Sequence, residues 1–293
     1  MLFDALYPAH FGVFVRAAEE WSDSPEVTTS LIKFMQEFVY NKAQRLVFDQ
    51  SSPNGILLFR ECSKIAVAFG TRVMQLPVTT SDLYKEKYKG IAICLGMLST
   101  ALAGTYVNFG VFTLYNDKAL EHALETALQL ALSVPLADVM AFPKLCKAYF
   151  SFFEILFRNH MGIIAALDTP VFMRVMQALH EGLQGLDAPL ASQCAAAIDH
   201  LATYHFKHSG KDVPPMRALK AHLAANPTLL SGLMSTLFNI LLFDSMSNNT
   251  ANQWAAFSAY KEHLTASQAP QNQPRLQEAF SKLLSDVQPN LES

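Results

Sequence analysis

Apolar side chains recur at helical spacing along most of this chain, most regularly in two early segments. In the first, the apolar positions follow the i, i+3, i+4, i+7, i+8 pattern that gathers side chains on one face of a helix: Leu31, Phe34, Met35, Phe38 and Val39. The second set with helical spacing is Leu58, Cys62, Ile65 and Phe69. No alternation of apolar and polar residues runs long enough to predict a sheet. The pattern therefore predicts an all-α chain.

Turn and capping residues divide this pattern into separate helices. Asn54 can accept hydrogen bonds from the first free N–H groups of a helix, and Pro77 ends that helix. Gly104 suits a helix end, and Asn116 or Asp117 suits the next helix start. The predicted helices cover residues 12–21, 25 onwards, 54–76, 82–103, a segment ending at 132, a short segment between the prolines at 135 and 143, and 143 onwards.

One capping device occurs twice in the second half of the chain. Asp168 precedes Pro170 by two residues, and Asp187 precedes Pro189 in the same way. In each case the aspartate suits the N-cap and the proline suits the first helical turn. Two such amphipathic helices joined by a short turn form a hairpin of roughly forty residues, the size of a HEAT or armadillo unit. We therefore expect an α-solenoid of antiparallel HEAT-like helix pairs.

The best loop in the chain separates two unequal parts. Residues 209–215 contain glycine, charged residues and two prolines. We expect HEAT-like repeats over residues 1–208 and further helical repeats over 216–293, with a frayed tail after Pro289.

Two stretches allow a different interpretation. Residues 90–116 carry no charged side chain, which meets the length criterion for a membrane span, but they include polar residues and several glycines. A buried helix followed by its turn explains this stretch better, so no membrane partner is predicted. Within it, residues 106–115 are aromatic and partly β-branched, which favours a strand by propensity alone. Because no partner strand is predicted, we expect a turn and a short helix.

Composition narrows the class of protein. Apolar residues make up 51% and charged residues 16% of the 293 positions, enough for a large core. The net charge of −3 argues against general nucleic-acid binding. Lys85, Lys87 and Lys89 form the longest basic feature. A solvated helix face is the favoured interpretation, and a contact patch for an acidic partner is the alternative.

Residues that could carry chemistry are few. The four cysteines, Cys62, Cys94, Cys146 and Cys194, are widely separated in apolar contexts, which predicts buried free thiols in a reducing compartment. The best metal candidate combines Asp199, His200, His205 and His208. Its spacing turns His200 away from His205, and no residue completes a zinc site. Glu121 and His122 lack the spacing of a metalloprotease motif. We predict no catalytic, cofactor-binding or metal residues, and an enzyme using the histidine cluster is the weakest alternative.

Four segments in colinear order carry a resemblance to a known family: residues 44–61, 89–115, 142–145 and 201–207. They resemble the exportin 7 / Ran-binding protein 17 family of nuclear transport receptors in the importin-β superfamily. The likeness extends from about residue 6 to about residue 286, is strongest in the first two segments and is weak after Ser209.

The resemblance implies a nuclear export receptor that carries protein cargo through the nuclear pore in a Ran-GTP-dependent way. Its implied partners are Ran-GTP, cargo and nucleoporins, and its implied location is the nucleus and cytoplasm. The chain resembles the C-terminal portion, with the Ran-binding part expected in a missing N-terminal portion. Phe109, Phe112 and Tyr115 are candidates for a shallow pocket for an extended peptide or Phe-Gly repeats, although interior packing is favoured. A Ran-independent protein-interaction scaffold is the alternative function.

Overall fold

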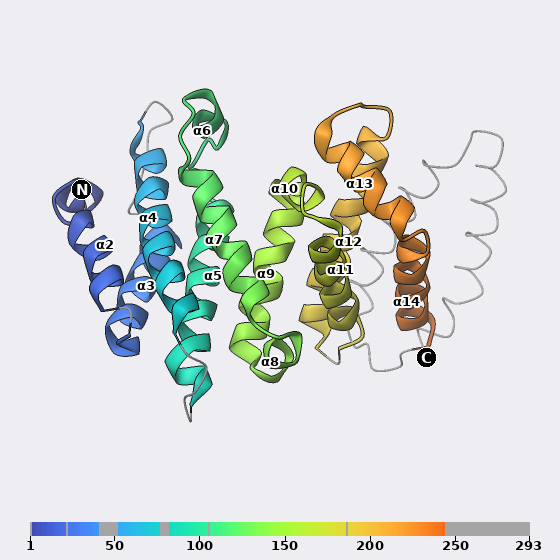
Figure 1. Cartoon of the computed structure of the whole chain (residues 1–293), viewed down its shortest axis with the longest axis horizontal. Coiled ribbons are helices and arrows are strands. Elements are labelled where there is room, and N and C mark those ends of the chain that lie inside the picture. Colours follow the sequence, from blue (N-terminus) through green and yellow to red (C-terminus); the bar gives the residue numbers. More distant parts are fainter. Residues whose placement is uncertain are drawn as a thin grey trace. The chain divides into compact units, whose positions relative to one another are not determined.

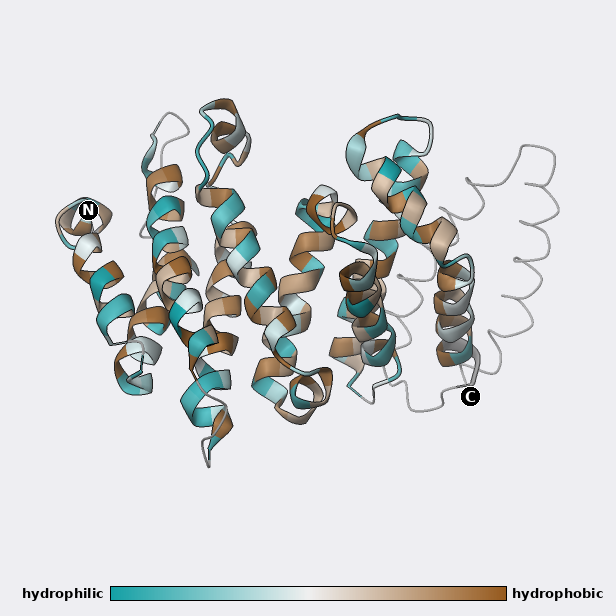
Figure 2. Cartoon of the chain, viewed as in Figure 1, coloured by the Kyte–Doolittle hydropathy of each residue, from teal (hydrophilic) through white to brown (hydrophobic). Residues whose placement is uncertain are grey.

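In the computed structural model the chain is a succession of α-helices that Figure 1 colours from the N-terminus to the C-terminus. The structure describes residues 2–21, 23–40, 52–76, 82–104, 106–185 and 187–243, and none of these lies in a β-strand. The chain divides into two compact units, Met1–Phe152 and Phe153–Ser293. Hydrophobic and hydrophilic residues alternate along many of the described helices (Figure 2). The all-α fold class predicted from the periodicity is confirmed.

The first unit is built from helices that pack side by side in pairs. The elements are α1 (Leu2–Leu6), α2 (Phe11–Glu20), α3 (Pro25–Tyr40), α4 (Asn54–Gln75), the π-helical turn η1 (Tyr84–Tyr88), α5 (Lys89–Leu102), α6 (Gly110–Leu114), α7 (Ala119–Ser133), α8 (Leu136–Ala141) and the first part of α9 (Pro143–Asn159). Helix α4 packs against both α2 and α7, and α3 packs against α5. The apolar stripe of α4 is fully buried in this unit.

The segment after α5 confirms the expectation of a turn and a short helix. Helix α5 ends at Leu102, and α6 follows from Gly110. Phe109 and Phe112 pack against Phe59 of α4, with ring centroids 5.2 and 5.3 Å apart. These contacts bury Phe112 and hold α6 over the start of α4. In the part of the chain that the structure describes, no helix combines the length and hydropathy of a membrane span.

Three details of the first unit differ from the sequence predictions. Asn54 does not cap α4: it is the first helical residue, and its backbone N–H donates to Ser52 Oγ over 3.3 Å. Phe34 is 40% exposed, because the buried stripe of α3 is centred on Ile32 and Met35 while Phe34 packs at its edge against Phe14.

The third difference is a π-helical turn, η1, where a continuous α-helix was predicted. Both tyrosines of this turn contact Phe142, with centroid distances of 4.9 Å for Tyr84 and 5.8 Å for Tyr88. The Tyr88 hydroxyl also donates to Asp138 over 2.6 Å. Burial and this hydrogen bond raise the pKa of Tyr88 to about 12. The widened turn is therefore stabilised by contacts that are distant in the sequence.

The second unit is built around a helical hairpin. Its elements are the last part of α9, then α10 (Met161–Ala165), α11 (Thr169–Leu183), α12 (Ala188–His208), α13 (Pro214–Ala225) and α14 (Leu229–Phe243). Helices α11 and α12 pack on each other, as predicted for a hairpin. The two predicted caps are confirmed: Asp168 accepts from Val171 N and Asp187 accepts from Leu190 N, each over 3.2 Å.

A buried histidine joins three helices of the second unit. His222 of α13 is 3% exposed, and its ring stacks on Phe172 of α11 with centroids 4.5 Å apart. Its Nε2 lies 3.1 Å from the Ala165 carbonyl oxygen, and its Nδ1 lies 2.8 Å from Thr169 Oγ1. Because a carbonyl can only accept, Nε2 donates to the Ala165 oxygen, and Nδ1 shares a hydrogen bond with the threonine hydroxyl. Both ring nitrogens of His222 therefore hold α13 against the end of α10 and the start of α11.

The predicted loop lies between α12 and α13, where residues 209–213 connect the two helices. The division of the chain into repeats on either side of this loop stays a prediction. The helices and tail predicted beyond residue 243 lie outside the described residues.

Candidate functional site

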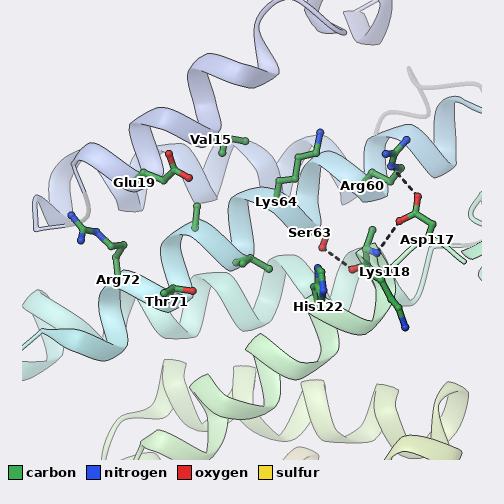
Figure 3. A pocket seen from close by; sticks show the side chains of 13 residues that line it. Val15, Glu19, Arg60, Ser63, Lys64, Thr71, Arg72, Asp117, Lys118 and His122 are labelled. Atoms are coloured by element: carbon green, nitrogen blue, oxygen red, sulfur yellow. Dashed lines mark hydrogen bonds and ion pairs between the residues drawn. The ribbon is translucent and has the colours of Figure 1, made fainter.

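A groove of about 530 Å³ lies over α4 in the first unit (Figure 3). Helix α2 forms one wall through Val15 and Glu19. The start of α7 and the residues just before it form the other wall, from Asp117 to His122. The groove therefore lies within a single unit and is shaped by three helices that pack together.

The amphipathic character of α4 explains why it forms the floor. Its buried stripe leaves the opposite face outward, where Arg60, Lys64, Val67 and Thr71 follow at i, i+4, i+7 and i+11. Short side chains at Ser63, Ala68 and Ala119 leave the space unfilled. Ser63 Oγ donates to the Ala119 carbonyl over 2.7 Å and so fixes α4 against the first residue of α7.

One carboxylate fixes the geometry of the groove at the end where α7 begins. Asn116 has a left-handed backbone with φ 52°, a conformation that asparagine tolerates better than most residues. The next residue, Asp117, accepts from Ala119 N over 2.9 Å and pairs with Arg60 Nε over 3.0 Å. A single side chain therefore caps α7 and orients Arg60 at the groove end.

The groove walls carry more positive than negative charge. The lining contains four cations, Arg60, Lys64, Arg72 and Lys118, and two carboxylates, Glu19 and Asp117, with His122 beside them. Lys64 pairs with Glu61 over 2.7 Å and Lys118 with Glu121 over 2.6 Å, although neither glutamate lines the groove. The hydrogen bond and charge of Lys118 lower the pKa of Glu121.

The three aromatic residues proposed as a pocket separate in the structure. Phe109 and Phe112 pack on Phe59 inside the first unit, in the way that the interior interpretation describes. Tyr115 is 76% exposed and its neighbour Leu114 is 77% exposed. These residues do not line the groove over α4.

The histidine cluster also serves local packing. His208 Nδ1 lies 3.0 Å from the Tyr204 carbonyl oxygen, and the two rings stack at 4.4 Å. Burial, together with the charge of Lys220, lowers the pKa of His205. Among the described residues, no three His, Cys, Asp or Glu side chains are grouped so that they could hold a metal ion. Asp199 and His200 bring no further ligand to such a group.

The lysine run is not a uniformly solvated face. Lys85 is exposed, whereas Lys87 is 9% exposed and donates from Nζ to the Leu76 carbonyl over 3.3 Å. Burial lowers the pKa of Lys87. The expectation of a solvated face is wrong for Lys87 because the π-helical turn directs it onto the end of α4.

The cysteines are buried free thiols, as predicted. Burial raises the pKa of Cys62 and raises that of Cys94 to about 12. The sequence interpretation did not identify the groove itself. The residues that face Arg60 across the groove come from α2 and α7, and no local sequence pattern joins them.

Packed helix pairs with a charged surface groove are typical of helical-repeat proteins that bind other proteins. No family model matches the chain. Exportin-7-B of Xenopus laevis is 40% identical over 314 residues, covering 99% of this chain and 28% of that protein. Ran-binding protein 17 of Mus musculus is 37% identical, covering 99% of this chain and 29% of that protein. Exportin-7 of Dictyostelium discoideum is 33% identical, covering 96% of this chain and 29% of that protein.

These similarities extend along nearly the whole chain and agree with the all-α fold. The chain belongs to the exportin-7 / Ran-binding protein 17 family. It spans less than a third of the length of the relatives that it matches.

Proposed function

We propose that this chain is the C-terminal portion of an exportin 7-like receptor that carries protein cargo through the nuclear pore in a Ran-GTP-dependent way. The observation that supports this function is the match to proteins named exportin-7 and Ran-binding protein, at 33–40% identity over 96–99% of the chain. The receptor acts by binding and catalyses no reaction.

The directionality of such a receptor follows from linkage between two ligands. If Ran-GTP and cargo stabilise the same conformation, each raises the affinity for the other by the same factor. GTP hydrolysis removes one ligand, so the affinity for cargo falls and cargo is released. In this proposal the receptor shuttles between nucleus and cytoplasm and contacts nucleoporins in transit. Ran contacts lie chiefly in an N-terminal portion, and this chain contributes helical surface for protein partners.

A chimeric receptor tests the proposal. The matched segment of Xenopus laevis exportin-7-B is replaced by residues 1–293, and export of a fluorescent cargo from permeabilised-cell nuclei is measured with Ran-GTP or Ran-GDP. We expect the chimera to export cargo with Ran-GTP only, and a receptor with the segment deleted to fail. Protein binding that is indifferent to the nucleotide would contradict the transport function and favour a Ran-independent scaffold.

The size of the endogenous protein provides an independent check. An extract of the source cells is analysed by immunoblot with an antibody raised against residues 54–75, the sequence of α4. The proposal expects a band several times heavier than 32.5 kDa. A single band at 32.5 kDa would contradict the idea that the chain is one portion of a full receptor.

A further inference from the structure

We infer that the groove over α4 binds an acidic segment of a partner protein. This deepens the proposed function by naming the chemistry of one partner, and it rests on that function in taking the ligand to be a protein. The inference itself comes from the shape of the groove, from the charge of its lining and from the position of Arg72.

The charge of the groove differs in sign from that of the chain. Its four cations outnumber its two carboxylates and give the lining a net charge of +2, whereas the chain carries −3. Opposite charge on a ligand segment both steers its approach and fixes its register. An acidic segment is therefore the complementary partner.

The cations differ in their freedom to bind a ligand. Arg60 is engaged by Asp117, and Lys64 and Lys118 by glutamates just outside the groove. Arg72 is exposed and forms no ion pair with another described residue. A ligand carboxylate can pair with Arg72 without displacing a carboxylate of the protein, so Arg72 is the first anchor. Arg60 can share its remaining guanidinium donors with a second ligand carboxylate.

The two arginines stand at opposite ends of the groove (Figure 3). They are twelve residues apart on one helix, which corresponds to roughly 18 Å at the α-helical rise. An extended peptide covers that distance in about five to six residues. Between the arginines, Val67 and Ala68 on the floor and Val15 on the α2 wall provide apolar surface. The fitting ligand therefore has two acidic side chains about five to six residues apart and a small apolar residue between them.

A nucleic acid fits these features less well than an acidic peptide. Affinity for a phosphate backbone grows with the number of phosphates neutralised by free cations. In this groove three of the four cations already have carboxylate partners. The groove also provides no aromatic face for a base, since none of the residues that line the groove is Phe, Tyr or Trp.

The test measures peptide binding to the complete 293-residue chain by fluorescence anisotropy. The probe is a fluorescein-labelled peptide of seven residues, with glutamate at positions 1 and 7, alanine at position 4 and glycine or serine elsewhere. The comparison peptide has glutamine in place of both glutamates. We expect the glutamate peptide to bind at least about ten-fold more tightly, because each end forms a charge-assisted hydrogen bond. Its affinity should fall as salt is added.

Two variants locate the binding to the groove. Arg72→Glu should weaken the glutamate peptide by at least about ten-fold, since it replaces the free anchor by a repelling charge. Lys33→Glu is the matched control, because it makes the same charge change at an exposed position of α3 outside the groove. It should leave the affinity within about two-fold. Val67→Trp fills the floor and should weaken binding without changing the charge.

Three outcomes would overturn the inference: equal binding of the two peptides, an equal loss in Arg72→Glu and Lys33→Glu, or tighter binding of a single-stranded oligonucleotide through the same residues. The assay contains neither Ran nor nucleotide. A negative result here leaves the export assay to decide the proposed function. Equally, if the chimera fails to export cargo, the peptide measurement still decides whether the groove binds an acidic segment.

Discussion

At the residue scale, Gly55 marks a close approach between the first turn of α4 and the chain before α6. A side-chain methyl group built at Gly55 would overlap the backbone carbonyl oxygen of Tyr106. Tyr106 cannot easily retreat, because its hydroxyl donates to the Val39 carbonyl over 2.6 Å. We therefore expect Gly55→Ala to lower the free energy of unfolding by about 1–3 kcal/mol. The midpoint of urea denaturation, followed by circular dichroism, measures this loss.

Gly12 provides the matched control at the same scale. It lies inside α2, and a methyl group there would meet no atom within 4 Å. Gly12→Ala removes the entropic cost of glycine in a helix, so it should stabilise the chain by about 0.5–1 kcal/mol. The same chemical change thus has opposite signs at two positions. A Gly55→Ala protein as stable as the unchanged chain would show that the Tyr106 segment gives way freely.

At the element scale, the two aspartate caps hold the hairpin of α11 and α12. Each carboxylate satisfies one backbone N–H that the helix leaves without an internal partner. Asp168→Ala and Asp187→Ala should each lower the free energy of unfolding by about 1 kcal/mol. The loss should be roughly additive in the double variant, because the two caps share no hydrogen-bond partner. Urea denaturation of the single and double variants measures these changes.

Asparagine at the same positions is the informative control. Asp168→Asn and Asp187→Asn retain an acceptor oxygen and should keep most of the stability. If asparagine proved as damaging as alanine, the negative charge near the helix dipole would carry the effect and the hydrogen bond would not.

The helices were predictable because their signals are local. The aspartate–proline caps, the prolines that bracket α8 and the apolar stripe of α4 all lie within a few residues of the structure that they specify. The predictions that were wrong share a different cause. Phe34 and Lys87 were misplaced because Phe14 and the Leu76 carbonyl, their actual neighbours, belong to other turns or helices.

The candidate groove was unpredictable for the same physical reason. Arg60, Glu19 and His122 line one groove only because α2 and α7 both pack against α4. Each residue alone is an ordinary polar position on a helix surface. The space between them comes from short side chains such as Ala68, whose effect depends on what lies opposite. The family resemblance, by contrast, was visible in the sequence because it lies in long colinear segments.

At the scale of the whole molecule, the cysteines report separately on the two compact units. Cys62 and Cys94 lie in the first unit and Cys194 in the second, and all three are fully buried. Burial raises the pKa of Cys62 and Cys94, which suppresses the reactive thiolate. We expect no reaction of these thiols with an aromatic disulfide reagent in the native chain. In increasing urea, each thiol should react as its own unit opens.

A substitution in one unit should then change the urea concentration at which the thiols of that unit are labelled, and should leave the thiols of the other unit unaffected. Gly55→Ala should lower the urea concentration at which Cys62 and Cys94 are labelled and leave Cys194 unchanged. The double variant Asp168→Ala, Asp187→Ala should do the reverse. Peptide mass spectrometry after pulse labelling assigns each modified cysteine. If the labelling of all three thiols shifted to the same lower urea concentration in both variants, the chain would unfold as one cooperative unit. In helical-repeat proteins that result requires strong coupling between neighbours, because stability there is a sum of repeat and interface contributions.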